Sequence, residues 1–167
     1  MAALCVLLLA ACGYDYKSRR IPNYLVLTAA FWGVLWRQWG EGAFGVASYL
    51  GQAVLVMALV YPLYRTGSFG AGDAKLLGVT AGYLPFGKIL AFLFCSLLIA
   101  AIFSLVKMWK GKNFGERIHY LSGYLSGVVR SGSWHLYLEN ERDRQAAGIC
   151  LSGPVFISIL LYLGGVY

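Results

Sequence analysis

Long apolar runs separated by short polar breaks dominate this chain of 167 residues. A helix rises about 1.5 Å per residue and the hydrocarbon core of a bilayer is about 30 Å thick, so about 20 mostly apolar residues can cross it. Pro22 disfavours helical geometry at the residue before it and marks the first break. The pattern predicts an all-α protein with six membrane-spanning helices, at about residues 1–20, 24–36, 43–64, 73–84, 86–108 and 146–167.

Small residues recur at every fourth position in two of these segments. One row consists of Ala43, Ala47 and Gly51, and the other of Gly78 and Gly82. Small side chains let helices approach closely in a membrane. Both rows are therefore predicted to pack against neighbouring helices.

The composition agrees with a membrane protein. Hydrophobic residues make up 59% of the chain and charged residues 13%, whereas a soluble domain carries about 25% charged residues. We expect a single membrane-embedded domain over residues 1–167, with a polar cytoplasmic segment at about 109–144. Helically spaced apolar residues in that segment are compatible with a surface helix on the cytoplasmic leaflet.

The net charge of +7 could indicate binding to nucleic acid. Six crossings with the N-terminus outside place all but two of the 14 Lys and Arg residues on the cytoplasmic side, the exceptions being Arg37 and Lys88. This asymmetry follows the positive-inside rule. The basic charge is thus assigned to topology, with membrane lipids and not nucleic acid as expected partners.

Four cysteines lie inside apolar runs, and none belongs to a C-x-x-C pair. A zinc site or a disulfide framework would require closer or more regular spacing. The sequence predicts neither a metal nor a cofactor.

Two carboxylates stand at the inner ends of predicted spans. Asp15 closes the first span and Asp73 opens the fourth. Because a carboxylate near hydrocarbon costs several kcal/mol, we interpret both as candidate functional residues. A pair of carboxyl groups that shares one proton can activate a water molecule, as in aspartic proteases. Gly70 and Gly72 would let the backbone take strained angles and let an extended substrate approach Asp73.

The two acids belong to two motifs whose aspartates are 58 positions apart. The first is D-x5-I-P-N, from Asp15 to Asn23, and the second is G-x-G-D-x-K-L, from Gly70 to Leu76. With both motifs in this order, the chain resembles the type IV prepilin peptidases. These are polytopic aspartic proteases of the cytoplasmic membrane of bacteria and archaea.

The resemblance implies that Asp15 and Asp73 are the catalytic pair, on the cytoplasmic side. It implies prepilin or pseudopilin substrates, whose short basic leader is cut just before a hydrophobic helix. The chain is similar to the compact, peptidase-only form, because it lacks the insertion with paired C-x-x-C motifs. Further residues expected to bind substrate or shape the site are Gly70, Gly72, Lys75, Arg19, Arg20, Pro22 and Asn23.

Other interpretations stay open at this point. Asp15 could form an ion pair with Arg19, and Asp73 could pair with Lys75 or with the N-terminus of its own helix. A small proton-coupled transporter also keeps paired carboxylates in its spans, and a noncatalytic subunit of a pilus assembly machine would need neither acid. The presenilin and signal-peptide-peptidase families pair similar motifs but need a Pro-Ala-Leu element near the C-terminus. This chain has Ser-Gly-Pro-Val there, at residues 152–155.

Overall fold

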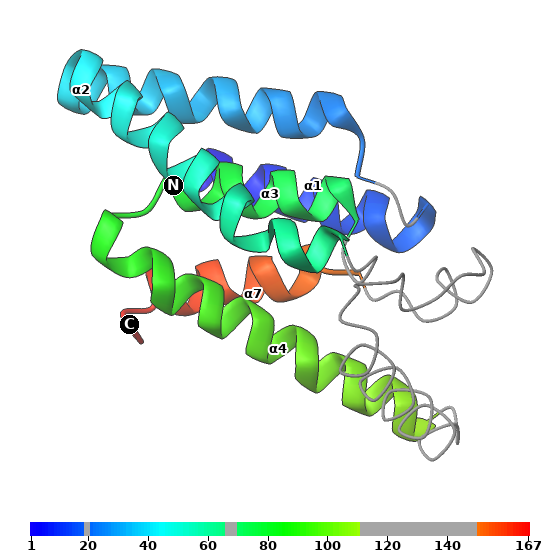
Figure 1. Ribbon diagram of the computed structural model, residues 1–167. Coiled ribbons are helices and arrows are strands. Elements are labelled where there is room, and N and C mark those ends of the chain that lie inside the picture. Colours follow the sequence, from blue (N-terminus) through cyan, green and yellow to red (C-terminus); the bar gives the residue numbers. More distant parts are fainter. Residues whose placement is uncertain (19–20, 66–69, 111–149) are drawn as a thin grey trace.

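The computed structural model describes residues 1–18, 21–65, 70–110 and 150–167, and within these ranges the protein is all-helical (Figure 1). The predicted all-α class is thus confirmed for this part of the chain. The predicted surface helix in the 109–144 segment falls almost entirely outside it. The elements are α1 (Ala2–Ser18), α2 (Asn23–Arg65), α3 (Ala71–Gly82), the short 3-10 helix η1 (Phe86–Lys88), α4 (Ile89–Lys110) and α7 (Ser152–Leu163).

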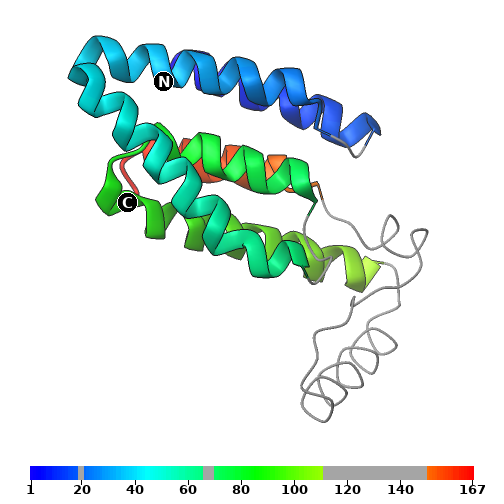
Figure 2. The same ribbon diagram turned by 45° about the horizontal axis from the view of Figure 1, so that its top comes forward.

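Helix α2 consists of two arms that meet at Gly42. The backbone of Gly42 has φ 63° and ψ −150°, a conformation that glycine adopts readily because it has no Cβ. The chain turns back at this point (Figures 1 and 2). The two arms correspond to the predicted segments 24–36 and 43–64, although the first arm continues beyond residue 36 to the turn.

Successive helical segments run in alternating directions between two ends of the bundle (Figures 1 and 2). One end holds the C-termini of α1 and α4, both termini of α2 and the N-termini of α3 and α7. The other end holds the Gly42 turn and both termini of the chain (Figure 1). The order of the segments follows the six predicted spans, whereas their passage through a membrane and the outside N-terminus remain predictions.

The helices differ in length. Within the described ranges, α2 and the stretch Phe86–Lys107 are long and apolar enough to cross a membrane. Helices α3 and α7 have 12 residues each, which corresponds to about 18 Å. Helix α3 is thus too short to cross about 30 Å of hydrocarbon by itself.

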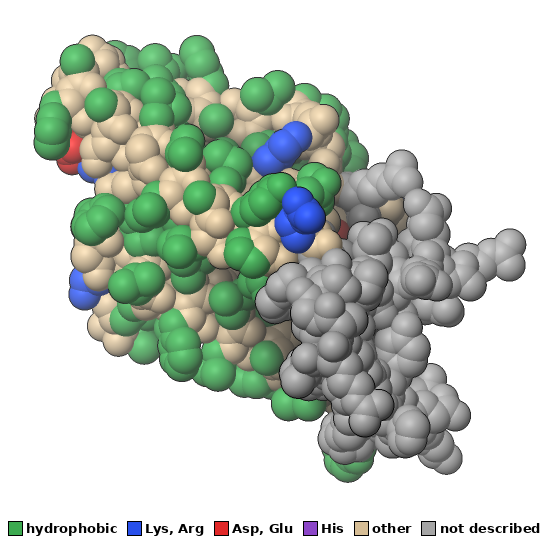
Figure 3. Space-filling view, viewed as in Figure 1, with side chains coloured by type: hydrophobic (Ala, Val, Ile, Leu, Met, Phe, Trp, Pro, Cys, Tyr) green, Lys and Arg blue, Asp and Glu red, His purple; other side chains and the backbone are tan. Residues whose placement is uncertain are grey.

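Apolar side chains cover much of the visible surface (Figure 3). Several large ones are more than half exposed, for example Leu27 at 68%, Leu90 at 73% and Phe94 at 67%. Exposed apolar area on this scale marks a surface that contacts lipid or another protein.

The packing of α2 against α3 centres on Tyr49, which is 1% exposed. Its hydroxyl donates a hydrogen bond to the carbonyl oxygen of Val79 at 3.2 Å, and its ring meets that of Tyr83 edge-on with centroids 5.7 Å apart. A Cβ atom added to Gly33 or to Gly82 would lie 2.5 Å from the Tyr49 ring. These two glycines therefore make the space that the ring occupies.

The row of Gly78 and Gly82 packs as predicted, since a Cβ atom on Gly78 would lie 2.9 Å from the carbonyl oxygen of Ala53. The prediction for the row of Ala43, Ala47 and Gly51 was wrong. All three are exposed, and a Cβ atom on Gly51 would meet no described residue within 4 Å. The second arm of α2 turns its other face to the bundle, and the buried residues there are Gly45, Tyr49, Gln52, Ala53, Val56 and Val60.

Two side chains hold the C-terminal end of α3 against the first arm of α2. Arg37 Nη2 donates to the carbonyl oxygen of Leu84 at 2.9 Å, and Nε and Nη2 both donate to that of Gly82 at 3.3 Å. The Tyr83 hydroxyl donates to the carbonyl oxygen of Ala29. Carbonyl groups at a helix C-terminus lack partners within the helix, and a cation there is favourable. Arg37 also forms an ion pair with Glu41 at 2.6 Å.

Candidate active site

Asp15 lies in the last turn of α1 and is 5% exposed. Its Oδ2 atom accepts hydrogen bonds from the hydroxyl of Ser152 at 2.6 Å and from the backbone N–H of Ser152 at 3.3 Å. Ser152 is the first residue of α7 and is fully buried. The N-cap of α7 is Leu151, whose side chain cannot accept a hydrogen bond. Asp15 therefore satisfies one of the free N–H groups at the start of this helix.

Asp73 is the third residue of α3. Its Oδ2 atom accepts a hydrogen bond from the backbone N–H of Gly70 at 3.2 Å. The carbonyl oxygen of Gly70 accepts hydrogen bonds in return from the N–H groups of Asp73 at 3.1 Å and Ala74 at 3.2 Å. The carboxylate thus stabilises the start of its own helix, as in a capping box.

The glycines of this motif provide space and not strained backbone angles, contrary to the sequence-based expectation. Gly70 has an ordinary extended backbone, with φ −77° and ψ 151°. A Cβ atom on Gly70 would lie 3.1 Å from Oδ2 of Asp73, and one on Gly72 would lie 3.4 Å from Cβ of Ile21. A side chain at Gly70 would crowd the carboxylate, whereas a Cβ atom at Gly72 would make an ordinary van der Waals contact with the loop before α2.

The two carboxylates lie at the same end of the bundle, because α1 ends there and α3 begins there (Figure 1). The sequence-based prediction placed both acids on the same face of the membrane; the structure places them at one end of the bundle, and the membrane face remains a prediction. Two carboxyl groups that come close together favour a state in which the pair holds one proton.

The two sequence motifs meet beside the acids. Lys75 Nζ donates a hydrogen bond to Asn23 Oδ1 at 3.3 Å, and Gly72 packs against Ile21. Pro22 accepts a hydrogen bond from the N–H of Leu25 at 3.1 Å, in the first turn of α2. The segment from Ile21 to Asn23 is therefore fixed between α2 and the first turn of α3.

The alternative roles of the two acids were ion pairs with Arg19 and Lys75 and, for Asp73, a contact with the N-terminus of its own helix. Arg19 and Arg20 lie outside the described residues. The suggested ion pair between Asp15 and Arg19 therefore also lies outside them. In the described part of the chain Asp73 forms no ion pair with Lys75, whereas its contact with the helix N-terminus is present. That contact can coexist with a catalytic role, because it involves one of the two carboxylate oxygens.

Sequence reasoning did not find Ser152. The Ser-Gly-Pro-Val stretch was noted as a departure from another family's element and not as part of a site. A serine at the start of an apolar helix is common, and 137 positions separate it from Asp15. The adjacent Cys150 thiol also donates to the backbone oxygen of Asp15 at 3.5 Å. Within the described ranges, no group of three His, Cys, Asp or Glu residues is arranged to hold a metal ion.

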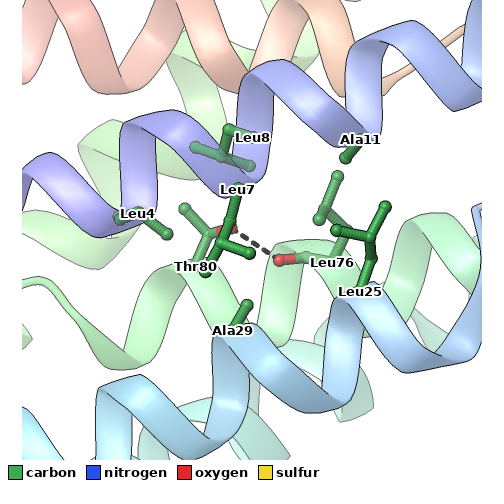
Figure 4. Close-up of a pocket in the computed structure, with 8 residues that line it drawn as sticks. All are labelled: Leu4, Leu7, Leu8, Ala11, Leu25, Ala29, Leu76 and Thr80. Atoms are coloured by element: carbon green, nitrogen blue, oxygen red, sulfur yellow. Dashed lines mark hydrogen bonds between the residues drawn. The ribbon is translucent and has the colours of Figure 1, made fainter.

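A small apolar pocket lies between α1, α2 and α3, about one helical turn from both acids (Figure 4). Ala11 is one turn before Asp15, and Leu76 is one turn after Asp73. The hydroxyl of Thr80 donates to the carbonyl oxygen of Leu76 at 2.7 Å and so offers no free donor to the pocket. The lining residues are Leu4, Leu7, Leu8, Ala11, Leu25, Ala29, Leu76 and Thr80.

A comparison with protein families identifies the chain. A sequence model of the type IV leader peptidase family matches residues 2–105. The chain belongs to this family. Comparisons with curated proteins and with solved structures gave no match.

As a member of the type IV leader peptidase family, the protein is a protease of the leader peptidase type. Membership and the two long apolar helices together indicate a membrane protein. The matched region contains Asp15, Asp73 and both motifs. It ends before α7, so Ser152 belongs to a part of this leader peptidase that the family match does not cover.

Proposed function

We propose that the protein is an aspartic endopeptidase that removes the short basic leader of type IV prepilins or prepilin-like proteins. Asp15 and Asp73 form its catalytic pair, and the reaction takes place at the cytoplasmic face of the cytoplasmic membrane of a bacterium or archaeon. The observation that carries the proposal is the location of these two acids at one end of the bundle, within a chain of the leader peptidase family.

The chemistry follows from two carboxyl groups that share one proton. The ionised carboxylate takes a proton from a water molecule while the water oxygen attacks the carbonyl carbon of the peptide bond. The protonated carboxyl group polarises the carbonyl oxygen. When the tetrahedral intermediate collapses, the C–N bond breaks and the leaving amine receives a proton. No other reactant is required for this hydrolysis.

The distribution of basic residues supports a cytoplasmic location for the site. Among the residues that the structure describes, Lys17, Arg65, Lys75 and Lys107 lie toward the end of the bundle that holds the acids. Arg37 and Lys88 lie toward the other end. Basic residues collect on the cytoplasmic side of membrane proteins.

The proposal can be tested with purified protein in detergent and a prepilin peptide that contains leader and hydrophobic helix. Wild type should release the leader, whereas Asp15→Asn and Asp73→Asn should each abolish release. Glu41→Gln is the matched control, because Glu41 is an exposed acid at the opposite end that pairs with Arg37. It should cleave like wild type. Cleavage by either aspartate variant would overturn the proposal, and proton flux in liposomes without cleavage would favour a transporter.

A further inference from the structure

The contact between Ser152 and Asp15 is stronger than a helix cap requires. A cap needs only the backbone N–H, which lies 3.3 Å from Oδ2 of Asp15. The serine hydroxyl adds a second bond of 2.6 Å to the same oxygen. This distance falls within the range of about 2.5–2.7 Å for a hydroxyl that donates to an ionised carboxylate, and such bonds are roughly twice as strong as neutral ones.

Because both partners are buried, the contact holds the Asp15 carboxylate in one orientation. Ser152 is 0% exposed and Asp15 is 5% exposed. Water therefore has little access with which to replace the hydroxyl. Both hydrogen bonds engage Oδ2, and in the described part of the chain no hydrogen bond reaches Oδ1 of Asp15. The side chain is held by one oxygen, and the other has no hydrogen-bond partner among the described residues.

The surrounding segment reinforces this arrangement. The Cys150 thiol donates to the backbone oxygen of Asp15 at 3.5 Å, so side chains of the segment that enters α7 reach both the backbone and the side chain of Asp15. Pro154 lies in the first turn of α7 and is buried, a position where proline is compatible with a helix. The start of α7 is thus a rigid support for the end of α1.

We propose that Ser152 is a positioning residue for Asp15. Its hydroxyl and backbone N–H hold Oδ2, so that Oδ1 is presented to the water that attacks the peptide bond. This inference rests on the proposed function and assigns to α7, which lies beyond the family match, a direct part in the site. Catalytic groups lose activity when they shift by small distances, because the reaction needs a narrow range of geometries.

The kinetic test compares three variants of the full chain in the peptide assay. Ser152→Ala should lower kcat roughly ten- to hundredfold and leave KM nearly unchanged. Ser152→Thr keeps a hydroxyl and should recover much of the lost kcat. Ser158→Ala is the matched control, because Ser158 is also a fully buried serine of α7 but bonds to the carbonyl oxygen of Phe92 and to Tyr167. It should leave kcat close to wild type.

A second measurement does not depend on activity. In an unfolding titration with SDS, Ser152→Ala should raise the unfolding constant about fivefold in wild type. In an Asp15→Ala background the same change should have less than about a twofold effect, because the carboxylate is gone. If wild type fails to cleave the peptide, the proposed function is wrong, and this cycle still decides whether Ser152 holds Asp15.

Four results would count against the inference. The first is a Ser152→Ala protein with wild-type kcat, and the second is a Ser158→Ala protein that loses as much kcat as Ser152→Ala. The third is an equal effect of Ser152→Ala on the unfolding constant with and without Asp15. A loss of kcat in Ser152→Thr equal to that in Ser152→Ala would also count against the hydroxyl.

Discussion

The same substitution at two glycines is expected to change stability in opposite directions. Replacing a helical glycine by alanine ordinarily stabilises a protein by about 0.5–1 kcal/mol, because the unfolded chain loses freedom. Gly51→Ala should show this gain, since a Cβ atom there meets nothing within 4 Å. Gly82→Ala should be destabilising, since its Cβ atom would lie 2.5 Å from the Tyr49 ring.

The expected loss at Gly82 follows from what the ring must give up. Carbon atoms pack best at about 3.5–4.0 Å, so the ring must move by about 1 Å. Tyr49 is buried, and the movement would strain its hydrogen bond to Val79. Overpacking of this kind costs about 1–3 kcal/mol. We therefore expect Gly82→Ala to lower the free energy of unfolding by about 1–3 kcal/mol.

The assay is unfolding of the purified protein in mixed micelles by SDS, followed by circular dichroism. A background with Tyr49→Ala provides the control, because removal of the ring should abolish the penalty of Gly82→Ala. A Gly82→Ala protein that is as stable as Gly51→Ala would refute the packing of α2 against α3 described above.

Four further substitutions can be measured in the same titration. Arg37→Ala should lower the free energy of unfolding by about 2–4 kcal/mol, because two carbonyl groups at the end of α3 lose a charged donor. Lys88→Ala, at the same end, should change it by less than about 0.5 kcal/mol, and equal losses in the two variants would contradict the role of Arg37. Tyr83→Phe should cost about 1 kcal/mol, since a buried carbonyl on the first arm of α2 loses its partner, and unchanged stability would argue against that bond. Lys75→Ala should cost only about 0.5 kcal/mol, because its bond to Asn23 is exposed; a much larger loss would mean that Lys75 has a deeper structural role.

The order and approximate limits of the helices could be predicted from the sequence because apolar runs and prolines determine them locally. The break before α2 coincides with Pro22, and the turn inside α2 at Gly42 falls in the predicted break between residues 36 and 43. The packing faces were harder to predict. The rows of small residues at Gly51 and Gly78 look alike in sequence, yet only Gly78 has a partner in the described structure. The buried face of the second arm of α2 is the one that carries the Tyr49 ring, and Gly33 and Gly82 in two other segments make space for that ring.

The candidate site was predicted in part for a similar reason. Asp15 and Asp73 stand out because acids are rare in apolar segments and their burial is costly. Their common location at one end follows from alternating helix directions, which the sequence also predicts. Ser152 does not stand out, because a serine can enter an apolar helix at little cost by bonding to the backbone. Its role becomes visible only when the start of α7 is placed beside the end of α1.

If the protein acts as proposed, the shortness of α3 would determine how far a substrate must travel into the membrane. Asp73 lies at the beginning of a helix of 12 residues, which reaches about 18 Å from the opposite end of the bundle. If the opposite end of α3 lies at the outer surface of a bilayer with about 30 Å of hydrocarbon, Asp73 would lie beneath the inner headgroups unless the lipid around it thins. A protein anchored by its own hydrophobic helix can reach such a depth by lateral diffusion, whereas a soluble peptide would first have to leave water. Selection of substrates would then begin with residence in the lipid, before any side chain of the leader is recognised.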